Sequence, residues 1–310
     1  MRVVITGGTG LIGGRLASDL QARGDEVIVL SRSRGTSSGE GLGVPVERWD
    51  GESLSGWEQC FDGAEVVVNL AGESIGGNGL TGIFFGPWTR DRKKRIHESR
   101  VKAGRAVTEA IRRASHKPRV LVQASAVGYY GPREEERLSE DCPAGTDYLA
   151  RVCADWEAST KEVEIMGVRR VVIRPGLALS RSGGIFPVMT LPFSLLVGGP
   201  LGSGRQWAPW IHLTDLVQAI MFLTDNEDAR GPYNLTAPQF LRNVEFERIL
   251  GRVMRRPYWF PAPALALRFV LGEKSTLVLD GQQPSPKRLT DAGFVFRYPN
   301  LDGALRDILS

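Results

Sequence analysis

Three glycines near the start of the chain have the spacing of a phosphate-binding loop. Gly7, Gly10 and Gly13 form a G-x-x-G-x-x-G motif. The first glycine permits a tight turn, the second lets the backbone approach a pyrophosphate, and the third lets a helix pack closely on a strand. Leu11 and Ile12 begin the helix whose positive end then faces the phosphates. We expect these five residues to bind a dinucleotide.

The strand and helix predicted on either side of the glycine loop support its role in dinucleotide binding. Residues 2–6 predict a short buried strand, because β-branched residues follow one another there. A helical apolar pattern then runs from Leu11 to Leu20, and a second apolar run at 27–30 closes a βαβ unit. A glycine trio alone is weak evidence, whereas one placed between a strand and a helix is much stronger.

The residues after the second strand favour NADP over NAD. An acidic residue at this position bonds the ribose 2′-hydroxyl of NAD, whereas an arginine accommodates the 2′-phosphate of NADP. Ser31 and Arg32 stand where the acid would be. The alternative is that Arg32 is a solvated loop residue. We therefore expect NADP(H) as the cofactor, with NAD less favoured.

Regular alternation of strand and helix patterns predicts an α/β fold, a Rossmann-type doubly wound parallel sheet. Further strands are expected at 44–50, 64–72, 119–125 and 170–176, with helices at 90–114 and 148–166. Ligands of such sheets bind at the carboxyl ends of the strands. Further cofactor contacts are therefore expected from the loops at that edge and from one arginine of the long helix, namely Asn69, Leu70, Ala71, Gly72, Arg174, Pro175 and Arg100.

The alternation ends at Leu177, so a smaller, mostly C-terminal substrate lobe is expected beyond it. We assign residues 1–235 to the dinucleotide-binding domain and 236–310 to a C-terminal domain, with 177–212 contributing to the substrate lobe. The substrate would lie between the lobe and the sheet edge, beside Ser125, Tyr129, Tyr130, Cys153, Trp210 and His212. Either tyrosine is a candidate proton donor, with buried packing as the alternative for one of them. Cys153 could instead be a small core residue, and His212 a hydrogen-bonded structural histidine beside Trp210 and Asp215.

Composition limits the class of protein. The chain has 310 residues, 42% hydrophobic and 24% charged, which is ordinary for a globular protein. Its three cysteines include no C-x-x-C pair, which argues against a disulfide framework or a zinc site. No apolar run reaches the ~18 residues that span a bilayer, and no signal-peptide pattern is visible. We expect a cytoplasmic protein with a small-molecule substrate, no metal and no membrane partner, and leave the oligomeric state open.

The basic residues between 90 and 105 are interpreted as a solvated helix face. Nucleic-acid binding would require exposed aromatics or a recognised module beside them, and neither is visible in the sequence. We therefore expect no nucleic-acid partner.

These motifs together resemble an extended or atypical short-chain dehydrogenase/reductase. The resemblance rests on Thr6–Gly13, Asn69–Gly72, Ser125 with Tyr130-Gly131, Arg174–Gly176 and Trp210–Asp215. Trp156-Glu157, the glycine loop at 198–204 and the tail containing Gly272-Glu273, Gly281-Gln282 and Gly293-Phe294 are similar to one subgroup, the epimerase family proteins, which carry a C-terminal domain of unknown function. This resemblance covers essentially the whole chain. It implies a Rossmann core, NADP(H), and epimerase or oxidoreductase chemistry.

The chain departs from that superfamily at one catalytic position. Its dehydrogenases use a serine and a Tyr-x-x-x-Lys pair, in which the lysine lowers the tyrosine pKa and the serine orients the substrate oxygen. Ser125 and Tyr148 match the serine and the tyrosine, but Val152 stands at the lysine position. Arg151 neighbours Tyr148 on the helix and is a candidate source of positive charge.

Two hypotheses follow for the function. In the first, Ser125 and Tyr148, helped by Arg151 or replaced by Tyr129, assist hydride transfer on a small carbonyl, hydroxyl or sugar-nucleotide substrate. In the second, the protein is an NADP-binding sensor or scaffold without turnover, because the catalytic motif is degenerate.

Overall fold

A central parallel sheet confirms the predicted fold class. The computed structural model describes residues 1–32, 43–76, 88–133 and 135–310. Within them, a seven-stranded sheet has the order β10-β7-β5-β4-β1-β2-β3, and every pairing in it is parallel. Its strands are β1 (Arg2–Thr6), β2 (Glu26–Ser31), β3 (Val46–Arg48), β4 (Val66–Asn69), β5 (Val120–Ala124), β7 (Arg169–Pro175) and β10 (Gly231–Leu235).

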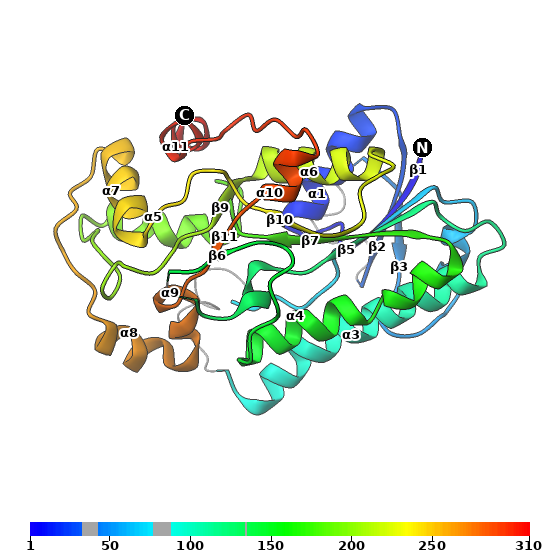
Figure 1. Ribbon diagram of the computed structural model, residues 1–310, viewed down its shortest axis with the longest axis horizontal. Coiled ribbons are helices and arrows are strands. Elements are labelled where there is room, and N and C mark those ends of the chain that lie inside the picture. Colours follow the sequence, from blue (N-terminus) through cyan, green and yellow to red (C-terminus); the bar gives the residue numbers. More distant parts are fainter. Residues whose placement is uncertain (33–42, 77–87, 134) are drawn as a thin grey trace.

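Helices cover both faces of this sheet because its strands are apolar on both faces (Figure 1). Val3 and Ile5 pack in one core with α1 (Leu11–Ala22) and α6 (Leu213–Asp225). Val4 points the other way, into a second core with α3 (Arg90–Arg113). The chain order reverses between β1 and β4, so their carboxyl ends form the crevice where ligands of such sheets bind.

The helix predicted at 148–166 is interrupted. α4 (Tyr148–Ala158) ends before a separate 3₁₀ helix, η3 (Lys161–Met166). The Ser159 hydroxyl donates to the Trp156 carbonyl, and the Thr160 hydroxyl donates to the Glu157 carbonyl. Such local side-chain bonds compete with helix continuation, and the sequence pattern did not reveal them.

A second lobe has a core of its own. That core joins α5 (Phe186–Ser194) and β9 (Trp210–His212) to α7 (Asn243–Met254) and α11 (Leu301–Leu309). The remaining elements of the lobe and its connections are β8 (Leu177–Leu179), α8 (Ala264–Leu271), η4 (Gly272–Ser275) and α9 (Thr276–Leu279).

The chain beyond residue 235 also packs on the Rossmann core. Leu289 of α10 (Lys287–Asp291) and Phe294 belong to the same core as α6. The Arg288 guanidinium donates to the Pro232 carbonyl at 3.0 Å, and β11 (Gln283–Pro284) pairs with β6 (Arg137–Leu138). The C-terminal segment therefore belongs to two cores.

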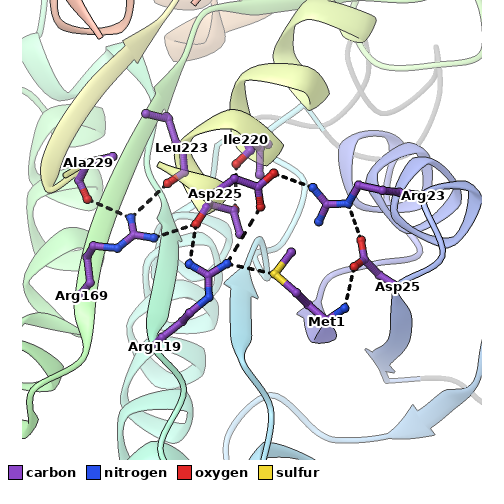
Figure 2. A network of polar contacts seen from close by, with 10 residues as sticks. Met1, Arg23, Asp25, Arg119, Arg169, Ile220, Leu223, Asp225 and Ala229 are labelled. Carbon is purple, nitrogen blue, oxygen red and sulfur yellow. Dashed lines mark hydrogen bonds and ion pairs between the residues drawn. The ribbon is translucent and has the colours of Figure 1, made fainter. Parts of the chain in front are cut away.

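Arginine side chains hold the C-terminal end of α6. This end of the helix lies toward the amino ends of the sheet strands, away from the predicted site. Figure 2 shows Arg169 donating to the carbonyls of Leu223 and Ala229, and Arg23 bridging Asp25 and Asp225. Arg169 and Arg119 also donate to the Thr224 carbonyl. These bonds satisfy carbonyl groups that a helix leaves open at its C-terminus.

Candidate cofactor and substrate site

The glycine loop has two glycines that the fold requires and one that it leaves open. Gly7 has a φ of +71°, and a Cβ there would lie 2.8 Å from the Leu70 carbonyl oxygen. A Cβ on Gly13 would lie 2.5 Å from the Gly7 oxygen. Gly10 is exposed, and a Cβ there would meet only the Gly7 oxygen, at 3.3 Å. The exposed side of the loop at Gly10 is therefore available to a ligand.

The amino end of α1 faces the same open space. Gly10 is its N-cap and has no side chain to accept the first N–H groups of the helix. These groups and the helix dipole favour an anion. Leu11 and Ile12, the first helical residues, are only partly buried, so the loop and helix fit the pyrophosphate predicted from the sequence.

A cavity of about 540 Å³ adjoins this loop. Its lining comes from two segments, one with Thr9, Leu11 and Arg15, the other with Ser180, Ser182, Gly183 and Gly184. The second of these segments was not predicted to belong to the site. Its signal was present as Ser180-Arg-Ser-Gly-Gly184, a serine- and glycine-rich turn directly after a strand. The volume lies in the range of small-molecule sites.

Arg32 and Ser31 lie at the carboxyl end of β2, as the NADP prediction requires. Ser31 is the last residue of that strand and is buried, while Arg32 is exposed. An exposed guanidinium there is free to approach a phosphate.

The loop after β4 is held by its asparagine. The Asn69 side chain accepts from the Thr6 hydroxyl at 2.6 Å and donates to the Gln123 amide oxygen at 2.8 Å. These bonds join β1, β4 and β5 beneath the sheet edge. The Asn69 side chain is therefore committed to the fold, and what the loop offers a ligand is the segment Leu70, Ala71 and Gly72.

Arg100 points inward, as predicted for one arginine of α3. Its side chain is buried, donates to the carbonyls of Ile96 and Glu73, and lies over the Trp156 ring at 5.0 Å. A Cβ on Gly72 would lie 3.0 Å from its Cζ. Burial lowers the pKa of this guanidinium, although arginine stays charged at neutral pH. A buried positive charge therefore lies directly against the β4 loop.

Ser125 is hydrogen-bonded to the Glu157 carboxylate, for which no role in the site was predicted. The Ser125 hydroxyl donates to Glu157 Oε1 at 2.6 Å. Arg174 donates to both oxygens of Glu157, at 2.8 and 3.0 Å. Burial alone would lower the pKa of Arg174, but the Glu157 carboxylate outweighs it and raises that pKa. Glu157 thus fixes both the hydroxyl of Ser125 and the guanidinium of Arg174.

Arg174, predicted as a cofactor contact, is bonded to several groups of the protein itself. Its side chain is buried, donates to the Tyr130 hydroxyl at 2.9 Å and to the Glu140 carbonyl at 3.1 Å, and lies 3.6 Å from the Tyr129 ring centroid. These contacts occupy the guanidinium within the protein. Its neighbour Pro175 ends β7 and is partly buried at the sheet edge.

The two tyrosines after Ser125 differ in their surroundings. Tyr130 is fully buried and donates its hydroxyl proton to the Asn234 side chain at 2.7 Å. Burial raises its pKa to about 12. It is therefore a packed, hydrogen-bonded phenol rather than an accessible proton donor. Tyr129 is partly exposed and packs edge-on against Tyr130.

Tyr148 lies at the start of α4 beside the amino-terminal part of α3. Its hydroxyl donates to the Lys93 carbonyl at 2.8 Å, and its ring contacts Trp88. Burial raises the pKa of this phenol, while Arg100 and Arg92 act to lower it. The exposed Arg151 instead donates to the Thr146 carbonyl. The buried cation that acts on Tyr148 is therefore Arg100, from a different helix.

Val152, at the position of the lysine in the Tyr-x-x-x-Lys motif, is part of an apolar core. Val152 is 1% exposed and packs with Trp88 and Ile96 in a small separate core. A lysine there would have to place an ammonium group in that core. Cys153 is also buried, and burial raises the pKa of its thiol to about 12. It is an inert core thiol at neutral pH.

Trp210 and His212 serve the second lobe. Trp210 is 1% exposed in the core of that lobe. His212 is the N-cap of α6, where its Nδ1 accepts from the Thr214 N–H at 3.1 Å. Burial lowers its pKa, and Asp307, 3.3 Å away, acts to raise it. Both residues therefore have structural roles near the predicted substrate side.

Two further properties concern only the described parts of the chain. Their helices include none that is both long and apolar enough to cross a membrane. Their histidine, cysteine and acidic side chains form no group of three that could hold a metal ion.

The fold and the open glycine loop define a dinucleotide-binding α/β protein, and the comparisons identify its family. The model of the NAD-dependent epimerase/dehydratase family matches residues 3–236, and a domain of unknown function, DUF1731, matches residues 262–308. The chain therefore belongs to the NAD-dependent epimerase/dehydratase family, with this C-terminal domain attached.

Curated relatives match over the whole chain. Epimerase family protein YfhF of Bacillus subtilis is 37% identical over 311 residues, covering 100% of this chain and 98% of the relative. The chloroplastic epimerase family protein SDR39U1 homolog of Arabidopsis thaliana is 40% identical, covering 100% of this chain and 87% of the relative. These matches confirm the subgroup predicted from the sequence motifs.

Solved structures match the same arrangement. Human epimerase family protein SDR39U1, crystallised with NADPH, gives a TM-score of 0.86 at 32% identity, with 99% of each chain covered. A Thermus thermophilus UDP-glucose 4-epimerase in complex with NAD gives a TM-score of 0.76 at 21% identity, covering 100% of this chain and 98% of that one. This second likeness shows the fold alone.

Proposed function

We propose that the protein binds NADP(H) and acts as an oxidoreductase on a small carbonyl or hydroxyl substrate. The observation that carries the cofactor is the open amino end of α1, with Arg32 exposed at the end of the neighbouring strand β2. The NADPH in the crystal structure of the human relative supports the same choice. When bound, the cofactor would supply or accept a hydride.

Tyr148 is the proposed proton donor, with Arg100 in place of the family's lysine. At neutral pH its raised pKa keeps the phenol protonated, which suits donation to a carbonyl oxygen. Arg100 lies between the β4 loop and the Trp156 ring, and its charge stabilises the phenolate that donation leaves. Before donation, the Tyr148 hydroxyl must exchange its bond to the Lys93 carbonyl for one to the substrate.

The alternative function is an NADP-binding sensor or scaffold without turnover. The same bond from Tyr148 to Lys93, together with the packed Val152, favours it. A third possible function, consistent with the family, is that of an epimerase acting on a sugar nucleotide. It predicts tight cofactor retention and a uridine diphosphate pocket.

A pair of alanine substitutions tests the cofactor loop. Gly10→Ala is expected to leave the unfolding midpoint unchanged, because its Cβ has room, but to weaken NADPH binding at least tenfold where the backbone must approach the pyrophosphate. Gly13→Ala is expected to destabilise the fold by about 2 kcal/mol through its contact with the Gly7 carbonyl. Calorimetric titration and denaturant unfolding measure the two effects. Unchanged NADPH affinity in Gly10→Ala would contradict the placement.

Charge reversal tests the 2′-phosphate assignment. Arg32→Glu is expected to lower NADPH affinity roughly tenfold or more while leaving NADH affinity equal or higher. Arg105→Glu, on an exposed position of α3, is the matched control and should change neither affinity. The assignment is wrong if Arg32→Glu binds NADPH as tightly as the unmodified protein.

Turnover separates the enzyme from the sensor. A panel of small aldehydes, ketones and keto acids is offered with NADPH, and the nicotinamide absorbance is followed. Tyr148→Phe is expected to lower kcat about a hundredfold or more with little change in NADPH affinity, because it removes only the proton donor. Arg151→Met should retain activity, since Arg100 supplies the buried charge. If NADPH binds but no compound of the panel causes its oxidation, the result would favour the sensor.

A further inference from the structure

The second lobe carries a cluster of large apolar side chains on its surface. Trp259 and Phe260 are 65% and 52% exposed, and Leu265, Phe269 and Val270 of α8 are 80%, 91% and 62% exposed. Only Leu271 of α8 is buried. Exposed apolar patches of this extent on a folded protein mark interaction surfaces.

We call residues 259–270, together with residues 195–197, the apolar strap, because hydrogen bonds at Trp259 and Phe260 join the two segments. The Trp259 indole donates to the Leu196 carbonyl at 2.9 Å, and the backbone N–H groups of Trp259 and Phe260 donate to the Gly198 carbonyl. Leu195, Leu196 and Val197 are themselves exposed. Figure 1 shows α8 at the rim of the molecule, beside α9. The strap is therefore fixed by backbone bonds while its side chains face outward.

The strap is flanked by positively charged side chains. Residues 255–272 contain three arginines, Arg255, Arg256 and Arg268, and no acidic residue. All three are exposed, and within the described residues none forms a direct ion pair, although Arg268 acts electrostatically on Asp280. On α8, Arg268 directly precedes Phe269, so a charged and an apolar group are presented together.

We propose that the apolar strap docks on the surface of an anionic lipid bilayer. Apolar and aromatic side chains would enter the boundary between headgroups and acyl chains, and the three arginines would contact lipid phosphates. The expectation of no membrane partner rested on the lack of a spanning segment, and docking at a surface needs none. A second copy of the chain fits less well, because a twofold interface would bring the same arginines together.

Vesicle sedimentation tests the proposal with the full-length protein. We expect binding to phosphatidylcholine vesicles that contain roughly a third phosphatidylglycerol, weak binding to pure phosphatidylcholine, and loss of binding at roughly 0.5 M salt. Phe269→Ser and Arg268→Glu should each lower the fraction bound about tenfold at low salt. Both positions are exposed, so thermal unfolding should be unchanged.

Matched controls come from other surfaces of the chain. Ile165, 87% exposed in η3, and Arg105, exposed on α3, supply Ile165→Ser and Arg105→Glu, which should bind like the unmodified protein. Three results would overturn the proposal: no binding to anionic vesicles, equal losses in the controls, or concentration-dependent self-association that Phe269→Ser abolishes. The last would assign the strap to a second copy. The test uses neither cofactor nor turnover, so its outcome is independent of the proposed function.

Discussion

Glu157→Leu is expected to destabilise the protein by about 3–5 kcal/mol, because it leaves a buried guanidinium without its carboxylate. The Arg174 side chain is 3% exposed and that of Glu157 is 14% exposed. Both guanidinium-to-carboxylate bonds are lost, along with the bond from the Ser125 hydroxyl. Denaturant unfolding at neutral pH measures the change.

A double substitution separates charge from packing. Glu157→Leu combined with Arg174→Met removes the unpaired charge, and it should recover a large part of the loss. It should not recover all of it, because Arg174 also donates to Tyr130 and to the Glu140 carbonyl. As a control, Glu52→Gln breaks the exposed pair with Lys102 and should leave the unfolding midpoint unchanged. A loss below about 1 kcal/mol in Glu157→Leu would show that solvent reaches the pair.

The Rossmann core could be predicted because each of its elements has a local signal. The β-branched residues of β1, the glycines after it and the apolar period of α1 all specify the same βαβ unit. The two-face burial of Val3, Val4 and Ile5 follows directly from a parallel sheet covered on both sides. Here local pattern and tertiary environment agree.

The substrate side could not be predicted to the same extent, because its contacts join distant parts of the chain. The bond from Ser125 to Glu157 spans 32 residues, and the bond from Tyr130 to Asn234 spans 104. A helix pattern shows that Arg151 neighbours Tyr148, but not that Arg100 of another helix supplies the buried charge. Likewise, Val152 is unexpected against a family motif and is explained only by the packing of Trp88 and Ile96.

The fold of the C-terminal segment could not be predicted from its own sequence either. Between Gly272 and α11 the chain forms only short elements, namely η4, α9, β11 and α10. Leu289 and Phe294 complete the core beside α6. Their roles depend on surfaces supplied by the first half of the protein, so no local window contains the information.

Glu247→Gln is expected to stabilise the protein by a few kcal/mol at pH 8 and to have little effect near pH 5. Glu247 is 3% exposed on the buried face of α7, where it accepts a hydrogen bond from the Asn243 amide at 3.4 Å. Burial raises the pKa of this carboxyl to about 8 from its ordinary value of 4.5. An amide has nearly the same shape and carries no charge, so it avoids the desolvation of a carboxylate.

The sign of the pH dependence follows from proton binding. Between pH 4.5 and about 8 the unfolded chain ionises Glu247 while the folded chain keeps the proton. The folded state then binds more protons, so stability falls as pH rises through this window and levels off above it. The shift corresponds to an order of magnitude of 3–5 kcal/mol when complete. Guanidinium unfolding at pH 5, 6.5 and 8 is the measurement that follows it.

The test is the difference in the free energy of unfolding between Glu247→Gln and the unmodified protein at each pH. In Glu247→Gln the fall in stability between pH 5 and pH 8 should be reduced, whereas Glu227→Gln, at an exposed position, should follow the unmodified protein. Parallel pH profiles for Glu247→Gln and the unmodified protein would mean that the pKa of the Glu247 carboxyl is not raised in the folded state. A buried acid that keeps its proton therefore makes the second lobe least stable at alkaline pH, and the effect should appear with or without NADPH, since α7 lies outside the glycine loop.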